Sequence, residues 1–218
     1  MRKAAKSIFI MMMASLLSGC FHMTSPEETI YTIFEKTVEK EKDFKELQQP
    51  LVELEKKESA IYDQIMELGM KEFTKIKKLA DDALLNVDER ENMMVKEQEA
   101  MNASQEEFEK AKEYIDKIKE KELKKAANDL YILMKKRYQA HEILFDIYKE
   151  GLEADRQLYR LFKDEELEYD VLEGQIEVTN THYAKLLEAN NQFNEATEEF
   201  NEKKLVFYQQ AGIQVEAQ

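Results

Sequence analysis

The sequence predicts an all-α protein: an elongated antiparallel coiled-coil bundle of three long helices, or of four if Pro50 breaks the first. The 218 residues include only five Gly and two Pro, so the chain has almost no turn punctuation. Charged residues make up 36% of it, and good helix formers such as Glu, Lys, Leu and Ala dominate. Apolar residues recur with a near-heptad spacing, which predicts stripes that must be buried between helices.

The first helical run is predicted from residue 27 to residue 85. Ser25 or Thr24 can cap its N-terminus, and Pro26 suits the first turn. The residues that keep the spacing across Pro50 are Leu47, Leu51 and Leu54. We therefore expect a kink or a very short break at the proline. Charged residues interrupt the apolar stripe at Glu58, Glu72 and Lys75.

A turn is predicted over residues 86–91, between the first and second runs. Asp88 can cap a new helix there, and Glu91 follows three residues later, as in a capping box. The second run then continues to about Phe162 without a proline. Because it is joined to the first by a tight turn, the two should pack antiparallel.

The third run is predicted to start after a break at Lys163-Asp164 and to end near Ala211-Gly212, where the glycine is a natural helix stop. The helical bundle would thus span residues 27–211, with residues 212–218 as a frayed C-terminus. The first two runs are longer than the third, which predicts a two-helix extension at one end.

Residues 1–19 have the pattern of a secretory signal peptide. Basic Arg2, Lys3 and Lys6 precede an apolar segment over residues 7–17. This apolar segment is too short to span a bilayer comfortably. Removing residues 1–19 would change the net charge from −14 to −17, because they carry three basic residues and no acidic one.

The stretch Leu17-Ser18-Gly19-Cys20 resembles a bacterial lipobox at all four positions, and Cys20 is the only cysteine of the chain. The resemblance implies cleavage between Gly19 and Cys20 by the lipoprotein signal peptidase and attachment of a diacylglyceryl group to the Cys20 thiol. Residues 20–26 would then be a lipid-anchored tether. The alternatives are an ordinary signal peptide with a stray cysteine and an uncleaved anchor.

The rest of the chain also resembles a known family. A lipobox precursor of this length with an acidic, Trp-free heptad body and the segment YTIFEKTVEKEKDF over residues 31–44 is similar to the YkyA-like lipoproteins of bacilli, whose family label is cell-wall binding. The resemblance covers essentially all of the chain. It implies a lipoprotein on the outer face of the cell membrane of a Gram-positive bacterium. It supplies no catalytic residue.

The charge and the motifs of the chain argue against nucleic-acid binding and against catalysis. An acidic body repels nucleic acid and anionic polymers, so we expect no nucleic-acid partner. The histidines are His22, His141 and His182, and none lies in a zinc-protease motif. No phosphate loop or nucleophile elbow is present in the sequence, so we predict no catalytic residues, no metal site and no cofactor.

Carboxylates and tyrosines are common in binding sites, but their positions in this chain fit helix surfaces and cores. The acidic pairs Asp81-Asp82, Glu106-Glu107, Glu165-Glu166 and Glu198-Glu199 are expected on solvated helix faces. The tyrosines Tyr131, Tyr138, Tyr148 and Tyr159 recur at spacings that fit a helical stripe, which more often belongs to a core or its rim than to a sugar site.

The leading hypothesis is a non-enzymatic, lipid-anchored surface protein that binds or scaffolds a cell-wall component or another envelope protein. The alternative is a regulatory subunit that docks on an envelope enzyme or transporter. An enzyme is the third hypothesis, and a pKa-shifted pair of carboxylates clustered in a pocket would be its sign.

Overall fold

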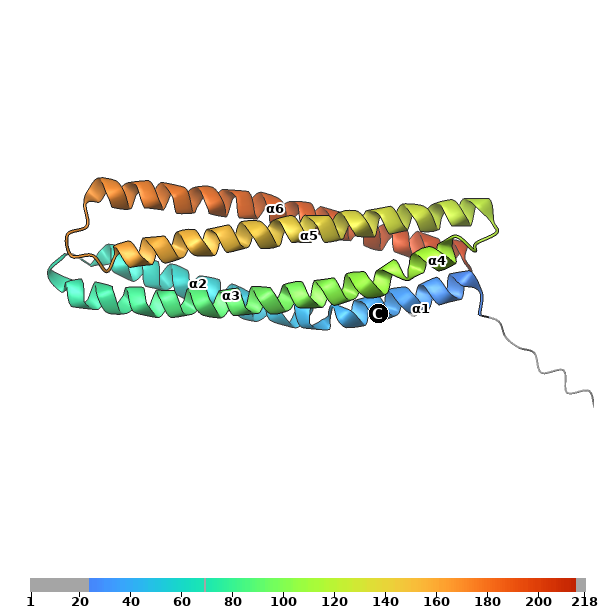
Figure 1. The fold of residues 1–218 in the computed structure, drawn as a ribbon, viewed down its shortest axis with the longest axis horizontal. Coiled ribbons are helices and arrows are strands. Elements are labelled where there is room, and N and C mark those ends of the chain that lie inside the picture. Colours follow the sequence, from blue (N-terminus) through green and yellow to red (C-terminus); the bar gives the residue numbers. More distant parts are fainter. Residues whose placement is uncertain (1–23, 69, 215–218) are drawn as a thin grey trace, which may run out of the picture.

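The computed structural model describes residues 24–68 and 70–214, and within these ranges the protein is entirely helical. The helices are α1 (Pro26–Lys40), α2 (Lys42–Glu67), the short 3-10 helix η1 (Met70–Glu72), α3 (Phe73–Glu109), α4 (Ala111–Ile115), α5 (Lys121–Leu161) and α6 (Tyr169–Gln210). They form four arms, α1–α2, α3–α4, α5 and α6, which run antiparallel along one axis (Figure 1). No helix among the described residues is long and apolar enough to cross a membrane.

The all-α, antiparallel prediction is confirmed, and the bundle has four arms. The prediction of a turn at residues 86–91 is wrong, because this segment lies inside α3. The chain reverses instead between α2 and α3 and at residues 116–120, in addition to the predicted break after Phe162. The predicted two-helix extension is also absent from the described bundle, since arms such as α5 and α6 have 41 and 42 residues.

Polar residues at 86–91 have tertiary partners, which explains why they do not form a turn. Asn86 is buried in α3 and donates from Nδ2 to the carbonyl oxygen of Leu54 at 3.0 Å. Asp88 and Glu91 both accept from Arg156 of α5. The polar residues of a capping box and those of a helix that contacts neighbouring helices have the same local composition. The sequence alone therefore favours a turn at this segment.

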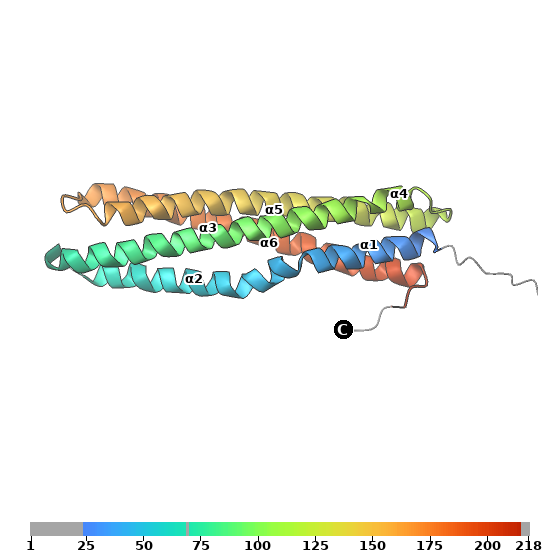
Figure 2. The same cartoon turned by 60° about the horizontal axis from the view of Figure 1, so that its bottom comes forward.

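Pro50 lies inside α2, and the first arm is interrupted nine residues earlier, at Glu41. The Glu41 side chain turns toward the bundle interior, where its carboxylate accepts from Arg137 of α5 at 2.7 and 2.8 Å and from Ser104 of α3 at 2.7 Å. Figure 2 shows the bend of the first arm between α1 and α2. The break therefore coincides with a side chain held by two other arms.

The remaining helix ends have local causes. Ser25 and Glu28 form a capping box at the start of α1. The turn at 116–120 contains no Gly or Pro, and it starts α5 with the Glu120 carboxylate, which accepts from two backbone amides of the first turn. Gly212, after α6, adopts a φ of +70°, which favours glycine. This end of α6 agrees with the predicted helix stop.

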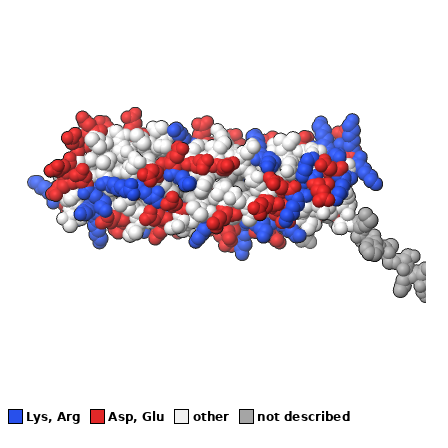
Figure 3. Space-filling model, in the orientation of Figure 1, with Lys and Arg blue, Asp and Glu red and all other residues white. Residues whose placement is uncertain are grey.

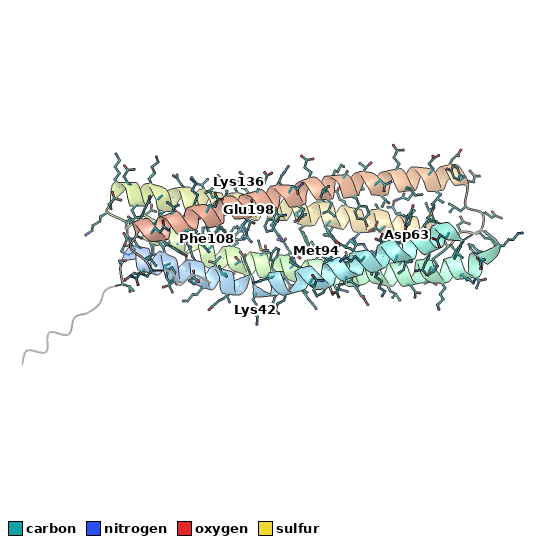
Figure 4. The ribbon with its side chains drawn as sticks, turned by 180° about the vertical axis from the view of Figure 1, so that it is seen from behind. Lys42, Asp63, Met94, Phe108, Lys136 and Glu198 are labelled. Carbon is teal, nitrogen blue, oxygen red and sulfur yellow. The ribbon has the colours of Figure 1, made fainter. Side chains whose placement is uncertain are left out.

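The core changes character along the bundle. Near α1, α4 and the end of α6, aromatic side chains fill it: Phe34, Phe108, Phe193, Phe200, Phe207 and Tyr208. Toward the other end, α2, α3 and α5 bury mainly aliphatic side chains, such as Ile61, Ile65 and Leu152, around a polar cluster. Figure 4 shows Phe108 and Met94 between the arms, with Lys42 and Lys136 toward the outer edges. The polar half of the core is where the candidate site lies.

Candidate functional site

A groove of about 630 Å³ runs between α2 and α6, and we call it the α2–α6 groove. Its apolar walls include Leu51 and Val52 of α2 and Leu186 and Leu187 of α6. Met94 of α3 and Leu144 and Leu158 of α5 also line it. The size is in the range of small-molecule sites.

Aromatic rings bridge the first arm and α6 near α1, whereas along the groove the Tyr183 hydroxyl of α6 reaches Glu58 of α2 at 3.4 Å. Near α1, aromatic rings span the gap between the first and the last arm: Tyr31 with Tyr208, Phe34 with Phe200, and Phe44 with Phe193, at centroid distances of 5.0, 6.0 and 5.7 Å. Several of the other side chains along the groove are shorter than these rings, such as Leu51, Val52 and Ile176. The residues that face each other thus decide where the bundle closes and where it stays open.

Polar groups line the same groove. They include the carboxylates of Glu55, Glu58 and Glu97, the hydroxyls of Tyr62, Tyr148, Tyr183 and Thr179, and the amides of Gln48, Asn180 and Asn190. No Lys, Arg or His of the described chain is among the lining residues. The groove therefore combines apolar walls with hydrogen-bonding groups and a negative charge.

A buried ion cluster, which we call the Arg90 cluster, lies beside the groove. Arg90 of α3 is 2% exposed, and its Nη1 lies 3.2 Å from Oδ2 of Asp155 and 3.7 Å from Oε2 of Glu58. Its Nε donates to the Tyr148 hydroxyl at 2.9 Å, and Tyr148 in turn donates to Oε1 of Glu55 at 2.9 Å. One guanidinium thus contacts two carboxylates from two arms, and Tyr148 links it to a third, Glu55.

Two further tyrosines complete the Arg90 cluster. Tyr183 of α6 donates to Asp155 at 3.0 Å and lies 3.4 Å from Oε2 of Glu58. Tyr159 of α5 donates to the other oxygen of Glu58. Burial raises the pKa of Tyr148, Tyr159 and Tyr183, so all three hydroxyls remain protonated donors at neutral pH. All four arms contribute to the cluster.

Burial, with the neighbouring Glu58 carboxylate, raises the pKa of Asp155 to about 6, and Arg90 offsets only part of this effect. The ordinary value is 3.8, so between about pH 4 and pH 6 folded Asp155 holds a proton that unfolded Asp155 releases. The contribution of Asp155 to stability therefore falls as the pH rises through this window, by about 3 kcal/mol in total.

The Asp155→Asn variant should lack this pH dependence, because its amide has no proton to lose in the window. We expect the free energy of unfolding of the wild type, measured with urea, to decrease relative to that of the variant between pH 4 and pH 7. Asp146→Asn, at an exposed position of the same helix, is the matched control. The raised pKa does not belong to Asp155 if the difference in unfolding free energy between the wild type and Asp155→Asn is as independent of pH as that for Asp146→Asn.

Comparison with known proteins places this geometry in a family. Residues 25–210 match the YkyA family, which is described as "Putative cell-wall binding lipoprotein". The chain belongs to the YkyA family. It is 39% identical over 203 residues to "Uncharacterized lipoprotein YkyA" of Bacillus subtilis (strain 168), covering 93% of this chain and 91% of that one.

The fold of this YkyA family member also occurs in a solved structure. A crystal structure of a conserved protein of unknown function from Staphylococcus aureus superposes with a TM-score of 0.75. The match covers 83% of this chain and 91% of that one at 19% identity, so it shows the four-arm helical fold alone.

The residues that the sequence predicts as the lipidation site of this YkyA family member, Leu17, Ser18, Gly19 and Cys20, lie outside the described residues, as does His22. Of the other histidines, His141 is buried and contacts Glu97 at 3.2 Å, and His182 is half-buried. Tyr138, Tyr148 and Tyr159 are buried and Tyr131 is half-buried, as expected of a stripe in the core or at its rim, but Tyr148 also lines the groove. The predicted acidic pairs are exposed except for Glu107, which is half-buried.

The members of the Arg90 cluster were not predicted as a site. One signal was available, because Glu58 occupies a core position of the heptad stripe between Leu54 and Ile61. A charged residue at such a position needs a buried partner. Arg90 carries no comparable signal, since it lies in a segment whose polar composition predicts a turn.

The Arg90 cluster brings together two buried carboxylates, Glu58 and Asp155, and burial raises the pKa of Asp155, which is one sign of a catalytic site. Glycosidases hold two carboxyls on opposite sides of the scissile bond. Here Glu58 and Asp155 contact the same Arg90 nitrogen and the same Tyr183 hydroxyl, so they lie side by side. Structural ion networks also shift pKa values. The arrangement therefore fits a charged wall of a binding groove better than a catalytic pair.

Proposed function

We propose that this YkyA family member is a non-catalytic lipoprotein, anchored through Cys20 to the outer face of the membrane of a Gram-positive bacterium, that holds a cell-wall component in the α2–α6 groove. The observation that carries the proposal is the groove itself, which combines apolar walls with tyrosine, amide and carboxylate groups. The family description supports a wall ligand. The lipobox supports the anchor.

The charge distribution suits this placement. Figure 3 shows Lys and Arg gathered at the end of the bundle from which the N-terminal trace leaves. Residues 110–125, which include α4 and the following turn, carry seven lysines and four acidic residues in a chain that is otherwise acidic. Basic groups near a membrane surface are attracted by anionic lipids. This end would therefore face the membrane, and the groove would lie farther out, toward the wall.

Retention on purified, protein-free wall sacculi tests the proposal. The wild-type protein should sediment with sacculi, and Asn180→Trp should reduce retention to background, because Asn180 lines the groove at an exposed position. Asn201→Trp is the matched control, since Asn201 is exposed on the same helix about 30 Å farther along.

Equal retention of both variants would exclude the groove as the wall site. Wild-type protein that ignores sacculi but brings down one stoichiometric protein from solubilised membranes would instead support the alternative, a regulatory subunit. Val52 and Leu187, exposed on opposite rims of the groove, are the apolar positions that a partner helix would cover.

A further inference from the structure

The α2–α6 groove has more negative than positive charge around it. Glu58 and Asp155 share the guanidinium of Arg90, half-buried Glu55 accepts only from the Tyr148 hydroxyl among the described residues, and Glu97 adds a further carboxylate to the lining. Glu97 contacts the imidazole of His141, which also lies in the core. Buried carboxylates are costly unless cations or hydrogen bonds compensate them. The groove therefore favours a ligand that brings a positive charge.

A second observation points to a ligand at the same place. Thr179 of α6 lines the groove and is 6% exposed, yet its Oγ1 has no hydrogen-bond partner among the described residues. Helical threonines usually donate to the carbonyl oxygen four residues earlier. Those that do so here are Thr29, Thr32, Thr37, Thr181 and Thr197. The Thr179 hydroxyl is thus available to a group inside the groove.

The groups that line the groove favour an organic cation over a metal ion. No group of three or more His, Cys, Asp and Glu side chains in the described residues is arranged to hold a metal ion. An ammonium group needs only three acceptors, and hydroxyl and carboxylate oxygens supply them. The tyrosine rings of Tyr62, Tyr148 and Tyr183 can also face a cation. These groups can bind an organic cation, whereas they do not provide the several ligands that a metal ion needs.

The apolar walls indicate what the cation is attached to. Val52 is 39% exposed and Leu187 is 64% exposed, one on each rim, and Leu51 and Ile176 lie along the walls. An aliphatic chain laid between them would cover these side chains. We propose that the α2–α6 groove binds an aliphatic primary ammonium group, with the ammonium near Glu55, Glu58 and Thr179 and the chain between the rims. This inference rests on the proposed function only in taking the groove as the ligand site.

The test uses full-length protein in phospholipid nanodiscs, titrated with n-pentylammonium and, separately, with n-pentanol and pentanoate. Methyl NMR signals report the site: Met94 lines the groove, whereas Met134 lies in the aromatic half of the core and serves as an internal control. We expect saturable shifts of Met94, an unchanged Met134, and binding of pentanol and pentanoate about tenfold weaker or less.

Glu55→Gln and Thr179→Val should each weaken pentylammonium binding about tenfold, since each removes one acceptor at nearly constant shape. Glu53→Gln is the matched control, because Glu53 is exposed on the same helix and does not line the groove. An unchanged Met134 spectrum and melting temperature show that a variant is folded. The proposal is overturned if pentanol binds as well as pentylammonium, or if Glu55→Gln and Glu53→Gln behave alike.

The sacculus and amine measurements can fail independently. Protein that binds sacculi through the groove but ignores pentylammonium would retain the proposed function and remove the ligand class. Protein that binds pentylammonium but not sacculi would retain the ammonium site and remove the wall as its source.

Discussion

Replacing Cys20 by serine should abolish lipid labelling and leave the precursor uncleaved. The thiol is the nucleophile that takes the diacylglyceryl group in a lipobox precursor, and a hydroxyl does not replace it. Each buried methylene contributes about 0.8 kcal/mol to membrane attachment, so the acyl chains supply most of the free energy of anchoring. Metabolic labelling with a radioactive fatty acid and mass spectrometry of the N-terminus measure both effects.

The matched control for this experiment is Met23→Ser, which places a serine just after the lipobox instead of inside it. It should be labelled and processed as the wild type is. Membrane fractionation alone is not decisive, because the uncleaved apolar segment can itself hold the precursor in the membrane. Normal cleavage and labelling of Cys20→Ser would show that the resemblance to a lipobox has no functional meaning here.

Replacing Arg90 by methionine should destabilise the protein by about 3–5 kcal/mol, because it leaves Glu58 and Asp155 buried without their cation. Arg160→Met makes the same change at a side chain that is 63% exposed, and it should cost at most about 1 kcal/mol. Urea unfolding followed by circular dichroism measures both values.

A compensated variant separates charge from packing. Adding Glu58→Gln and Asp155→Asn to Arg90→Met removes the uncompensated carboxylates and should recover most of the lost stability. If Arg90→Met costs no more than Arg160→Met, the Arg90 cluster does not hold the four arms together.

The fold class follows from the sequence because helical periodicity is a local property. Spacings such as Leu47, Leu51 and Leu54 indicate which face of a helix is buried, whatever it packs against. Start and stop signals with their own local chemistry, such as the Ser25 capping box and Gly212, also agree with the structure. The division into arms is different, since an unbroken heptad pattern does not reveal where the chain reverses.

The reversals show this limit in particular residues. The turn at 116–120 has neither Gly nor Pro, and the first arm ends beside Gly69, which lies outside the described residues and interrupts no apolar spacing in the sequence. The polar segment at 86–91 predicts a turn but binds other arms through Asn86 and Arg90. The turn at 116–120 is missed because its residues carry no turn signal, whereas the false turn at 86–91 arises because a polar residue looks the same locally whether water or a distant side chain satisfies it.

The sequence by itself determined that this protein is a helical bundle and predicts that Cys20 carries a lipid. Only the tertiary structure decided that four arms leave a groove between α2 and α6 and that Arg90 and Asp155 meet beside it. These two residues are 65 positions apart, and their contact depends on the register between α3 and α5. Local spacing fixes which side of each helix is buried, whereas register and the size of facing side chains fix which buried groups meet and where the bundle stays open.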